Sequence, residues 1–177
     1  MNDDRPIDIR PARPDDALCL GVLALQVFLD TYAPEGIHPP LAREALATGS
    51  VEGFAALVAD QAISILVAER GGSLVGFAQV EHGKPHAQVA ESRAAELRRL
   101  YVQEPFTGRG VGRALLARAE REAAARGART LWLTAWTGNA RALAVYPRCG
   151  YAHAGDTVYT IEGRDFPNKL FAKALAA

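Results

Sequence analysis

The chain has 177 residues, 49% hydrophobic and 23% charged, and its 20 basic residues balance 20 acidic ones. This length and composition predict a single domain over residues 1–177. A formal charge of zero argues against the positive field on which non-specific nucleic-acid binding depends, and no apolar run approaches the roughly 18 residues that a membrane helix needs. The acidic N-terminus carries no basic-then-apolar leader. We therefore expect a cytoplasmic protein that binds neither nucleic acid nor membrane.

The first elements are a short strand and a helix. Ile7 and Ile9 alternate with polar residues, which predicts a strand, and Asp15 or Asp16 can cap the helix that follows. In that helix large apolar residues recur at helical spacing. They predict a stripe that faces the core, made of Leu18, Val22, Leu25 and Leu29.

The middle of the chain predicts one more helix and then a hairpin. A helix is expected over residues 41–47, with a break at Gly49. The apolar runs at 65–68 and 74–80 flank a Gly71-Gly72 turn, which is typical of a β-hairpin. Residues 81–92 lack periodicity and predict a loop.

The remaining elements alternate between strand and helix. Strands are expected at 97–102, 130–136, 158–161 and 170–174, and a helix at 111–126. A short helix should begin at Asn139 and end near Tyr146, because Pro147 cannot continue it. The order predicts the α/β class, with a mixed central sheet and helices on both faces.

A glycine-rich turn between a strand and an amphipathic helix is the most informative segment. Glycines at positions 108, 110 and 112 leave backbone N–H groups uncovered at a helix N-terminus, where an anion such as a diphosphate can bind. The last glycine is followed by Arg113-Ala114, which excludes a nucleotide-hydrolysing phosphate loop. Leu115 stands where a dinucleotide-binding fingerprint needs its third glycine. A glycine turn without a ligand is the alternative.

Two sequence blocks resemble the GNAT superfamily of acyl-coenzyme-A-dependent N-acetyltransferases. The first is the glycine segment, which departs from the family pattern at its first position: Thr107-Gly108-Arg109-Gly110-Val111-Gly112. The second begins with a strand at 131–134 and continues as Asn139-Ala140-Arg141-Ala142-Leu143-Ala144-Val145-Tyr146-Pro147-Arg148-Cys149-Gly150-Tyr151. The resemblance covers residues 74–174 and implies a mostly antiparallel sheet whose two central parallel strands splay apart.

The resemblance implies that the chain is an enzyme with acetyl-coenzyme A as co-substrate and without a metal. Main-chain groups of Leu100, Tyr101 and Val102 would bind the pantetheine arm and the acetyl carbonyl. The loop from Thr107 through Gly108, Arg109, Gly110, Val111 and Gly112 to Arg113 would hold the diphosphate. Asn139 matches a family residue that contacts the cofactor, although a helix cap explains it equally well.

Two residues match family positions that move protons. Tyr146 would protonate the departing thiolate, with an aromatic core residue as the alternative, and Pro147 is expected to disfavour helical geometry there. Glu96 lies on the strand that leads to the loop and would act as general base. A solvated glutamate paired with Arg98 or Arg99 is its alternative. Lesser candidates for the base are Glu81, His82 and His86.

The acceptor of the acetyl group should meet the end of the first helix, where Phe28 and Tyr32 could contact an amine, unless this is an ordinary amphipathic helix. The expected activity is acetyl transfer to a primary amine of a small molecule or protein by direct attack in a ternary complex. The alternative is a catalytically weak acyl-coenzyme-A sensor. A nucleotide-binding regulatory domain fits the glycine segment poorly. A homodimer through an exposed strand edge or apolar face is compatible with the sequence.

Overall fold

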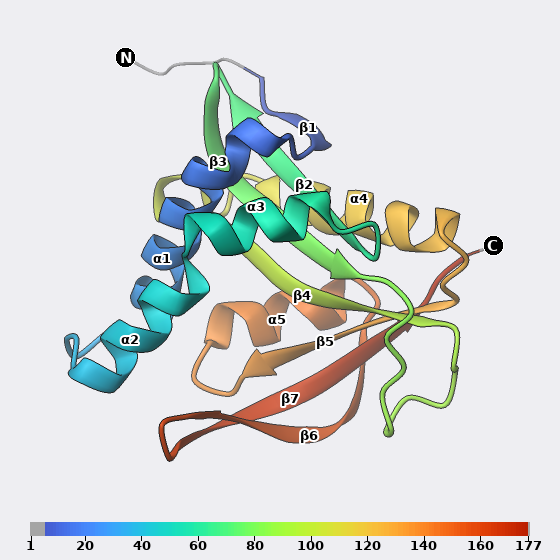
Figure 1. The fold of residues 1–177 in the computed structure, drawn as a ribbon. Helices are drawn as coiled ribbons and strands as arrows, with labels where there is room; N and C mark the ends of the chain where they lie inside the picture. Colours follow the sequence, from blue (N-terminus) through green and yellow to red (C-terminus); the bar gives the residue numbers. More distant parts are fainter. Residues whose placement is uncertain (1–5, 177) are drawn as a thin grey trace. The chain divides into compact units, whose positions relative to one another are not determined.

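The computed structural model describes residues 6–176, which form a mixed sheet with the strand order β1-β2-β3-β4-β5-β7-β6 (Figure 1). The pairing of β4 with β5 is parallel, and the pairings of β1 with β2, β5 with β7 and β6 with β7 are antiparallel. This arrangement confirms the predicted fold class. The strands are β1 (Asp8–Pro11), β2 (Ile63–Arg70), β3 (Ser73–Glu81), β4 (Ala94–Val102), β5 (Thr130–Trp136), β6 (Ala152–Ile161) and β7 (Arg164–Ala174).

Five α-helices accompany the strands in the described range. They are α1 (Ala17–Tyr32), α2 (Pro39–Thr48), α3 (Val51–Ala59), α4 (Val111–Ala125) and α5 (Ala140–Arg148). Each of them is too short or too polar to cross a lipid bilayer. The helix α3 is absent from the sequence expectations. Its signal is Ser50, whose hydroxyl accepts a hydrogen bond from the Gly53 N–H and so caps the helix.

The chain divides into two compact units. Unit 1 runs to Gln79 and includes Arg99–Ala119, and unit 2 comprises Val80–Arg98 and the chain from Glu120 onward. Both units draw on β3, β4 and α4, so one strand can supply functional residues to each. The single domain over residues 1–177 stays a prediction.

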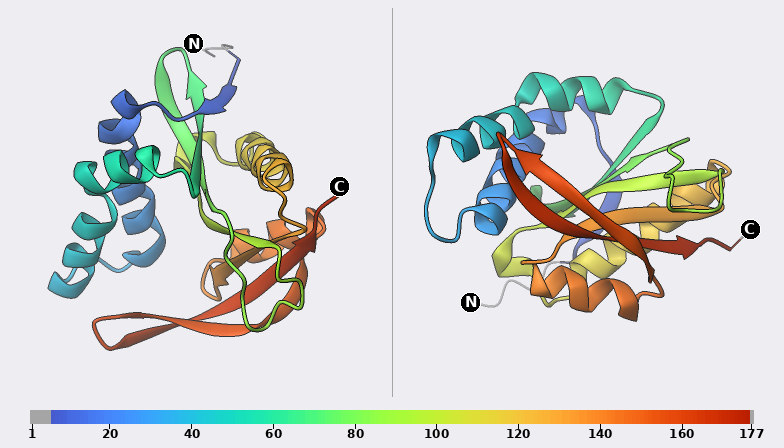
Figure 2. Two further views of the ribbon diagram at one scale, coloured as in Figure 1. Left: turned by 45° about the vertical axis from the view of Figure 1, so that its right-hand side comes forward. Right: turned by 90° about the horizontal axis from the view of Figure 1, so that it is seen from below.

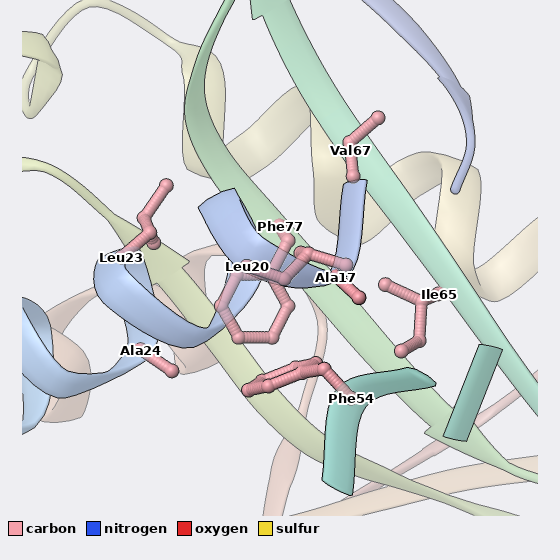
Figure 3. Close-up of a cluster of buried hydrophobic side chains, with 8 residues drawn as sticks. All are labelled: Ala17, Leu20, Leu23, Ala24, Phe54, Ile65, Val67 and Phe77. Atoms are coloured by element: carbon pink, nitrogen blue, oxygen red, sulfur yellow. The ribbon is translucent and has the colours of Figure 1, made fainter. Parts of the chain in front are cut away.

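Unit 1 is built around an aromatic and aliphatic core beneath α1 and α3 (Figure 3). Phe54 of α3 meets Phe77 of β3 edge to face, with 5.6 Å between ring centroids, and Leu20 of α1 is fully buried beside them. In Figure 2 the helices α1–α3 and the first half of α4 lie on opposite sides of β2 and β3. Burial of these side chains stabilises unit 1 because apolar surface leaves water.

The core-facing stripe of α1 differs from the predicted one. Leu18 and Val22 are 60% and 62% exposed. The buried face of α1 includes small residues, so the spacing of large apolar side chains did not predict it. Its residues are Ala17, Leu20, Gly21, Leu23, Ala24 and Phe28. Asp16 likewise does not cap α1 with its side chain. Its carboxylate accepts from the Arg13 N–H and from Arg10, closing the turn before the helix.

Close backbone approach explains why α1 turns this face inward. A Cβ added at Gly21 would lie 2.5 Å from the carbonyl oxygen of Gly49, and one added at Gly49 would lie 2.8 Å from that of Gly21. Only residues without a side chain allow the two backbones to come this close. Gly21 and Gly49 therefore fix how α1 meets the end of α2.

Unit 2 contains the long antiparallel hairpin of β6 and β7, with α5 nearby (Figure 1). Both strands are longer than predicted, because the turn at Glu162-Gly163 has positive φ at both residues and lets pairing begin at Ile161 and Arg164. The loop between β3 and β4 packs on this unit. The Trp132 indole donates to the Lys84 carbonyl at 2.7 Å, and the Gln88 amide donates to the Asp156 carbonyl at 3.4 Å.

The helix α5 continues beyond the predicted end. It extends through Pro147 to Arg148, so the expectation that it ends near Tyr146 is wrong. Proline this close to a helix C-terminus removes a single backbone N–H. The chain closes the helix with bonds from Cys149 N–H to the Val145 carbonyl and from Tyr151 N–H to the Tyr146 carbonyl, both at 3.1 Å.

The Gly21 contact yields a test of unit 1 packing. Gly21→Ala should lower the free energy of unfolding by about 1–3 kcal/mol, because the methyl meets a backbone carbonyl that moves only with α2. Gly112→Ala is the matched helical control, because a Cβ at Gly112 would meet only the Val102 side chain, at the ordinary contact distance of 3.8 Å. Thermal and urea unfolding measure both. A Gly21→Ala variant as stable as Gly112→Ala would contradict this packing.

Candidate active site

The glycine-rich loop forms an open backbone cradle at the start of α4. Gly108 and Gly110 have φ of +71° and +85°, and no atom lies within 4 Å of a Cβ built on either. Ala114 N–H donates to the Gly110 carbonyl at 3.0 Å, so the helix begins here. The N–H groups of Val111, Gly112 and Arg113 belong to the first turn and have no intrahelical acceptor. This end of α4 can bind an anion.

The side chains around the loop also suit an anionic ligand. Arg109 and Arg113 are exposed, so both guanidinium groups can reach a phosphate. The Thr107 hydroxyl instead donates to the Glu104 carbonyl at 2.9 Å, which holds the loop entry. The residues present therefore fit a diphosphate in unit 1, with backbone donors near its centre and two arginines beside them.

The second half of β4 leads into this loop. Leu100, Tyr101 and Val102 are half-buried, and the next residue, Gln103, donates its N–H to the Val75 carbonyl at 3.0 Å. A Cβ on Gly76 would lie 2.7 Å from the Tyr101 carbonyl oxygen, so β3 comes unusually close there. The close packing within unit 1 holds this stretch of backbone in a fixed position.

Glu96 lies on the first half of β4, in unit 2, and is buried. The parallel ladder joins Ala94–Glu96 to Thr130–Trp132, which makes Glu96 the last β4 residue paired with β5 in the described chain. The residue is 7% exposed, and its Oε1 accepts from Arg98 Nη1 at 3.3 Å. The alternative of a solvated glutamate is wrong in its burial, whereas the expected pairing with Arg98 is present.

Burial changes the acid strength of this carboxyl. Loss of water raises the pKa of Glu96 above its ordinary value, because the charged form is less well solvated. Arg98 and Lys84 act in the opposite direction by favouring the carboxylate, and the negative charge of Glu81 adds to the increase. A carboxylate of raised pKa is a stronger base, which suits proton abstraction.

The second sequence block lies at the β5 end and on α5, in unit 2. The Asn139 amide oxygen accepts from the Ala142 N–H at 3.0 Å, so this side chain caps α5. Tyr146 lies within α5 and is 9% exposed. Its ring packs against Tyr151 and Phe171, with centroid distances of 5.8 and 5.9 Å. Packing on two sides limits the directions in which the ring can point.

A half-buried polar cluster supports Tyr151 behind Tyr146. The Tyr151 hydroxyl donates to Glu120 at 3.1 Å, and Lys173 donates to the same carboxylate at 2.8 Å. Burial raises the pKa of the Tyr151 phenol, and the Glu120 charge adds to the increase, so this hydroxyl stays protonated. The cluster holds Tyr151 in place, and Tyr151 in turn packs against one side of the Tyr146 ring.

The predicted acceptor residues lie at the end of α1, in unit 1. Phe28 is 2% exposed, and its ring packs at a tilt against Tyr32 with 4.8 Å between ring centroids. The Tyr32 side chain is only half-buried. Of this pair, Tyr32 thus has the more accessible ring, and its contact with an acceptor stays a prediction.

The lesser candidates for the base are spread over unit 2. Glu81 pairs with Lys84 at 3.1 Å. The His86 ring lies tilted against Trp132, with 4.7 Å between ring centroids. Burial lowers the pKa of His82, which favours its neutral form. The sequence predicted Arg98 only as a partner of Glu96. Because the two residues lie two apart on one strand, their side chains share a face of the strand, and this spacing could have placed Arg98 beside Glu96 near the candidate site.

Comparisons with known proteins find related acetyltransferases. The acetyltransferase (GNAT) family model matches residues 27–151. The chain is 36% identical over 93 residues to an IAA acetyltransferase of Azospirillum brasilense, a match that covers 52% of this chain and 57% of that protein. It is 29% identical to streptothricin acetyltransferase of Streptomyces lavendulae, over 84% of this chain and 82% of that one.

Solved structures share the fold along nearly the whole chain. PaiA N-acetyltransferase of Thermoplasma acidophilum, solved in complex with coenzyme A, matches with a TM-score of 0.74 and 23% identity over 96% of this chain and 99% of that one. A GCN5-related N-acetyltransferase of Rhodopseudomonas palustris matches with a TM-score of 0.69 and 27% identity over 95% of each chain.

The loop geometry yields a test of ligand binding in unit 1. Gly110→Asp should abolish binding of coenzyme A in calorimetry, because a carboxylate in the cradle repels the diphosphate. Gly110→Ala imposes the same strain at φ +85° without charge and should weaken binding less. Gly72→Asp, at φ +83° in the β2–β3 turn, is the matched control and should bind normally. Unimpaired binding by folded Gly110→Asp would exclude the loop as the diphosphate site.

Proposed function

The chain belongs to the acetyltransferase (GNAT) family, and on that premise we propose that it transfers the acetyl group of acetyl-coenzyme A to a primary amine by direct attack in a ternary complex. The observation that carries the proposal is the family match over residues 27–151 together with the open glycine cradle at the start of α4. The relatives named above as acetyltransferases support the same activity.

Backbone groups hold the co-substrate in this proposal. The first-turn N–H groups of α4 and the arginines at 109 and 113 bind the diphosphate. The main chain of Leu100–Val102 binds the pantetheine arm and orients the acetyl carbonyl. Asn139 contacts the co-substrate in addition to capping α5. Backbone donors suit this task because they need no side-chain ordering to bind.

Glu96 removes the proton that would otherwise block the reaction. A lysine-like amine with a pKa near 10.4 is only about 0.04% neutral at pH 7, so most acceptor molecules carry no lone pair. Glu96 takes the proton directly or through a water molecule, and its raised pKa favours this step. The neutral nitrogen then forms a bond to the acetyl carbonyl carbon, and the carbon–sulfur bond breaks. The nitrogen also loses its second proton, which balances the proton that Tyr146 gives to the sulfur.

Tyr146 supplies the proton to the departing sulfur. An ordinary phenol is protonated at neutral pH and can act as an acid without further tuning. The sensor alternative relied on Pro147 disturbing this tyrosine. Because α5 continues through Pro147 and packs Tyr146 against Phe171, the helical position of Tyr146 supports its proposed role. The cytoplasmic location and the homodimer expected from the sequence stay predictions.

Amine-dependent release of coenzyme A tests the function. We expect release from acetyl-coenzyme A with a panel of primary amines, and formation of the N-acetyl product by mass spectrometry. Tyr146→Phe should lower kcat by about 100-fold or more, because it removes only the donor hydroxyl and keeps the packed ring. Its melting temperature and acetyl-coenzyme A affinity should match the wild type. Tight binding without product from any amine would instead support the sensor.

The pH profile tests Glu96. We expect kcat/KM to rise as Glu96 ionises, with a midpoint above the pKa of a free glutamate, because burial favours the protonated form. Glu96→Gln should remove this acid limb and lower the rate about 100-fold or more. Glu91→Gln, which alters a loop carboxylate paired with Arg93, is the control and should keep the profile. An unchanged profile in Glu96→Gln would assign the base elsewhere.

A further inference from the structure

Arg98 is a charged residue beside the proposed base that the mechanism above does not use. It lies two residues after Glu96 on β4, so the two side chains share one face of the strand. Its guanidinium contacts Glu96 through Nη1 alone, at 3.3 Å, and does not form the two-bond fork that arginine and carboxylate prefer. Most of its N–H donors therefore remain available to a ligand.

Exposure separates the two members of this pair. The Arg98 side chain is 51% exposed, whereas that of Glu96 is 10% exposed. The neighbouring pair repeats the pattern, because Lys84 is 54% and Glu81 18% exposed, with 3.1 Å between ammonium and carboxylate. In both pairs the carboxylate is the less exposed member and the cation the more exposed one. We call these four side chains the charged patch. Its formal charges sum to zero, but the negative charges are less exposed than the positive ones.

This arrangement of charges favours a ligand whose positive and negative groups are arranged in the opposite order. An amine that approaches Glu96 must place its nitrogen at the less exposed carboxylates and the rest of the molecule at the exposed cations. A purely cationic amine would meet Arg98 and Lys84 first and be repelled. An acceptor with a negative group close to its nitrogen would satisfy both layers, because its charges reverse those of the patch.

We infer that Arg98 binds a carboxylate of the acceptor, and that the acceptor is an amine bearing this carboxylate close to the reacting nitrogen, as in a free amino acid. The inference rests on the proposed function, because it needs Glu96 to receive the nitrogen. The spacing supports it. Residues two apart on a strand lie about 6.6 Å apart at Cα, and the longer arginine reaches back toward Glu96, so one small molecule can contact both groups.

Tyr159 of β6 belongs to the same neighbourhood. Its phenol lies close enough to Arg98 that its negative charge would raise the pKa of the guanidinium, which Glu96 and Glu81 raise as well, while burial acts against them. Arg98 therefore stays cationic throughout the working pH range of the enzyme. A permanent cation is what a carboxylate anchor requires.

Matched acceptor pairs test the inference. L-phenylalanine, L-methionine and L-leucine are each compared with the amine that lacks the α-carboxylate, and kcat/KM is measured by coenzyme A release. Because removal of the carboxylate also makes the amine more basic, the informative quantity is the change in each ratio between variants. Arg98→Gln should lower the preference for the carboxylate-bearing member by about 10- to 100-fold, the range for a lost charged hydrogen bond. Arg98→Lys should retain part of it.

Arg93→Gln is the control. Arg93 also pairs with a glutamate two residues away, Glu91, at 3.8 Å, and its side chain is 59% exposed. It should keep the wild-type ratio. Melting temperature and acetyl-coenzyme A affinity verify that each variant folds and binds.

Two results would overturn the inference. If Arg98→Gln lowers kcat/KM equally for both members of each pair, Arg98 acts only by positioning Glu96. If the wild type acetylates the amines but none of the amino acids, the acceptor has no such carboxylate. Failure of the proposed function looks different, because then no acceptor of either series releases coenzyme A from a protein that still binds it.

Discussion

The short parallel ladder between β4 and β5 is the constraint on which the rest of the site depends. Three residue pairs join the strands, and the ladder ends at Glu96. Buried backbone N–H and C=O groups need partners, so a strand that leaves its neighbour must be stabilised by other contacts or by a ligand. Further along, β4 receives such support from β3 inside unit 1, where Gln103 bonds to Val75 and Gly76 allows close approach.

One strand contributes residues to both units. Its first half holds Glu96 in unit 2, and its second half leads into the glycine cradle in unit 1. The cost of burying the Glu96 carboxylate is offset in part by Arg98. The single contact between them leaves the pKa of the carboxyl raised and the guanidinium accessible, and a partly exposed pair of this kind adds little to stability.

The supports of the site differ between the two units. In unit 1 the positions of α1 and α2 follow from a contact between glycine backbones, which a single methyl group would disturb. In unit 2 a half-buried ion pair between Lys173 and Glu120 holds Tyr151 against Tyr146. The glycine contact and the ion pair both act on helices and strands. Functional groups carried by such rigid elements are placed more precisely than groups carried by loops.

The sequence by itself determined the features that depend on local chemistry. The Gly71-Gly72 turn, the cradle at Gly108 and Gly110 and the Asn139 cap each follow from what one residue type does to its own backbone. The tertiary structure decided which side of α1 is buried, because that depends on the fit of Gly21 to Gly49 and not on the size of Leu18. It likewise decided that α5 tolerates Pro147 and that Glu96 is buried while Arg98 is exposed. Burial of a charge depends on neighbours distant in sequence, and residue order alone does not contain those distances.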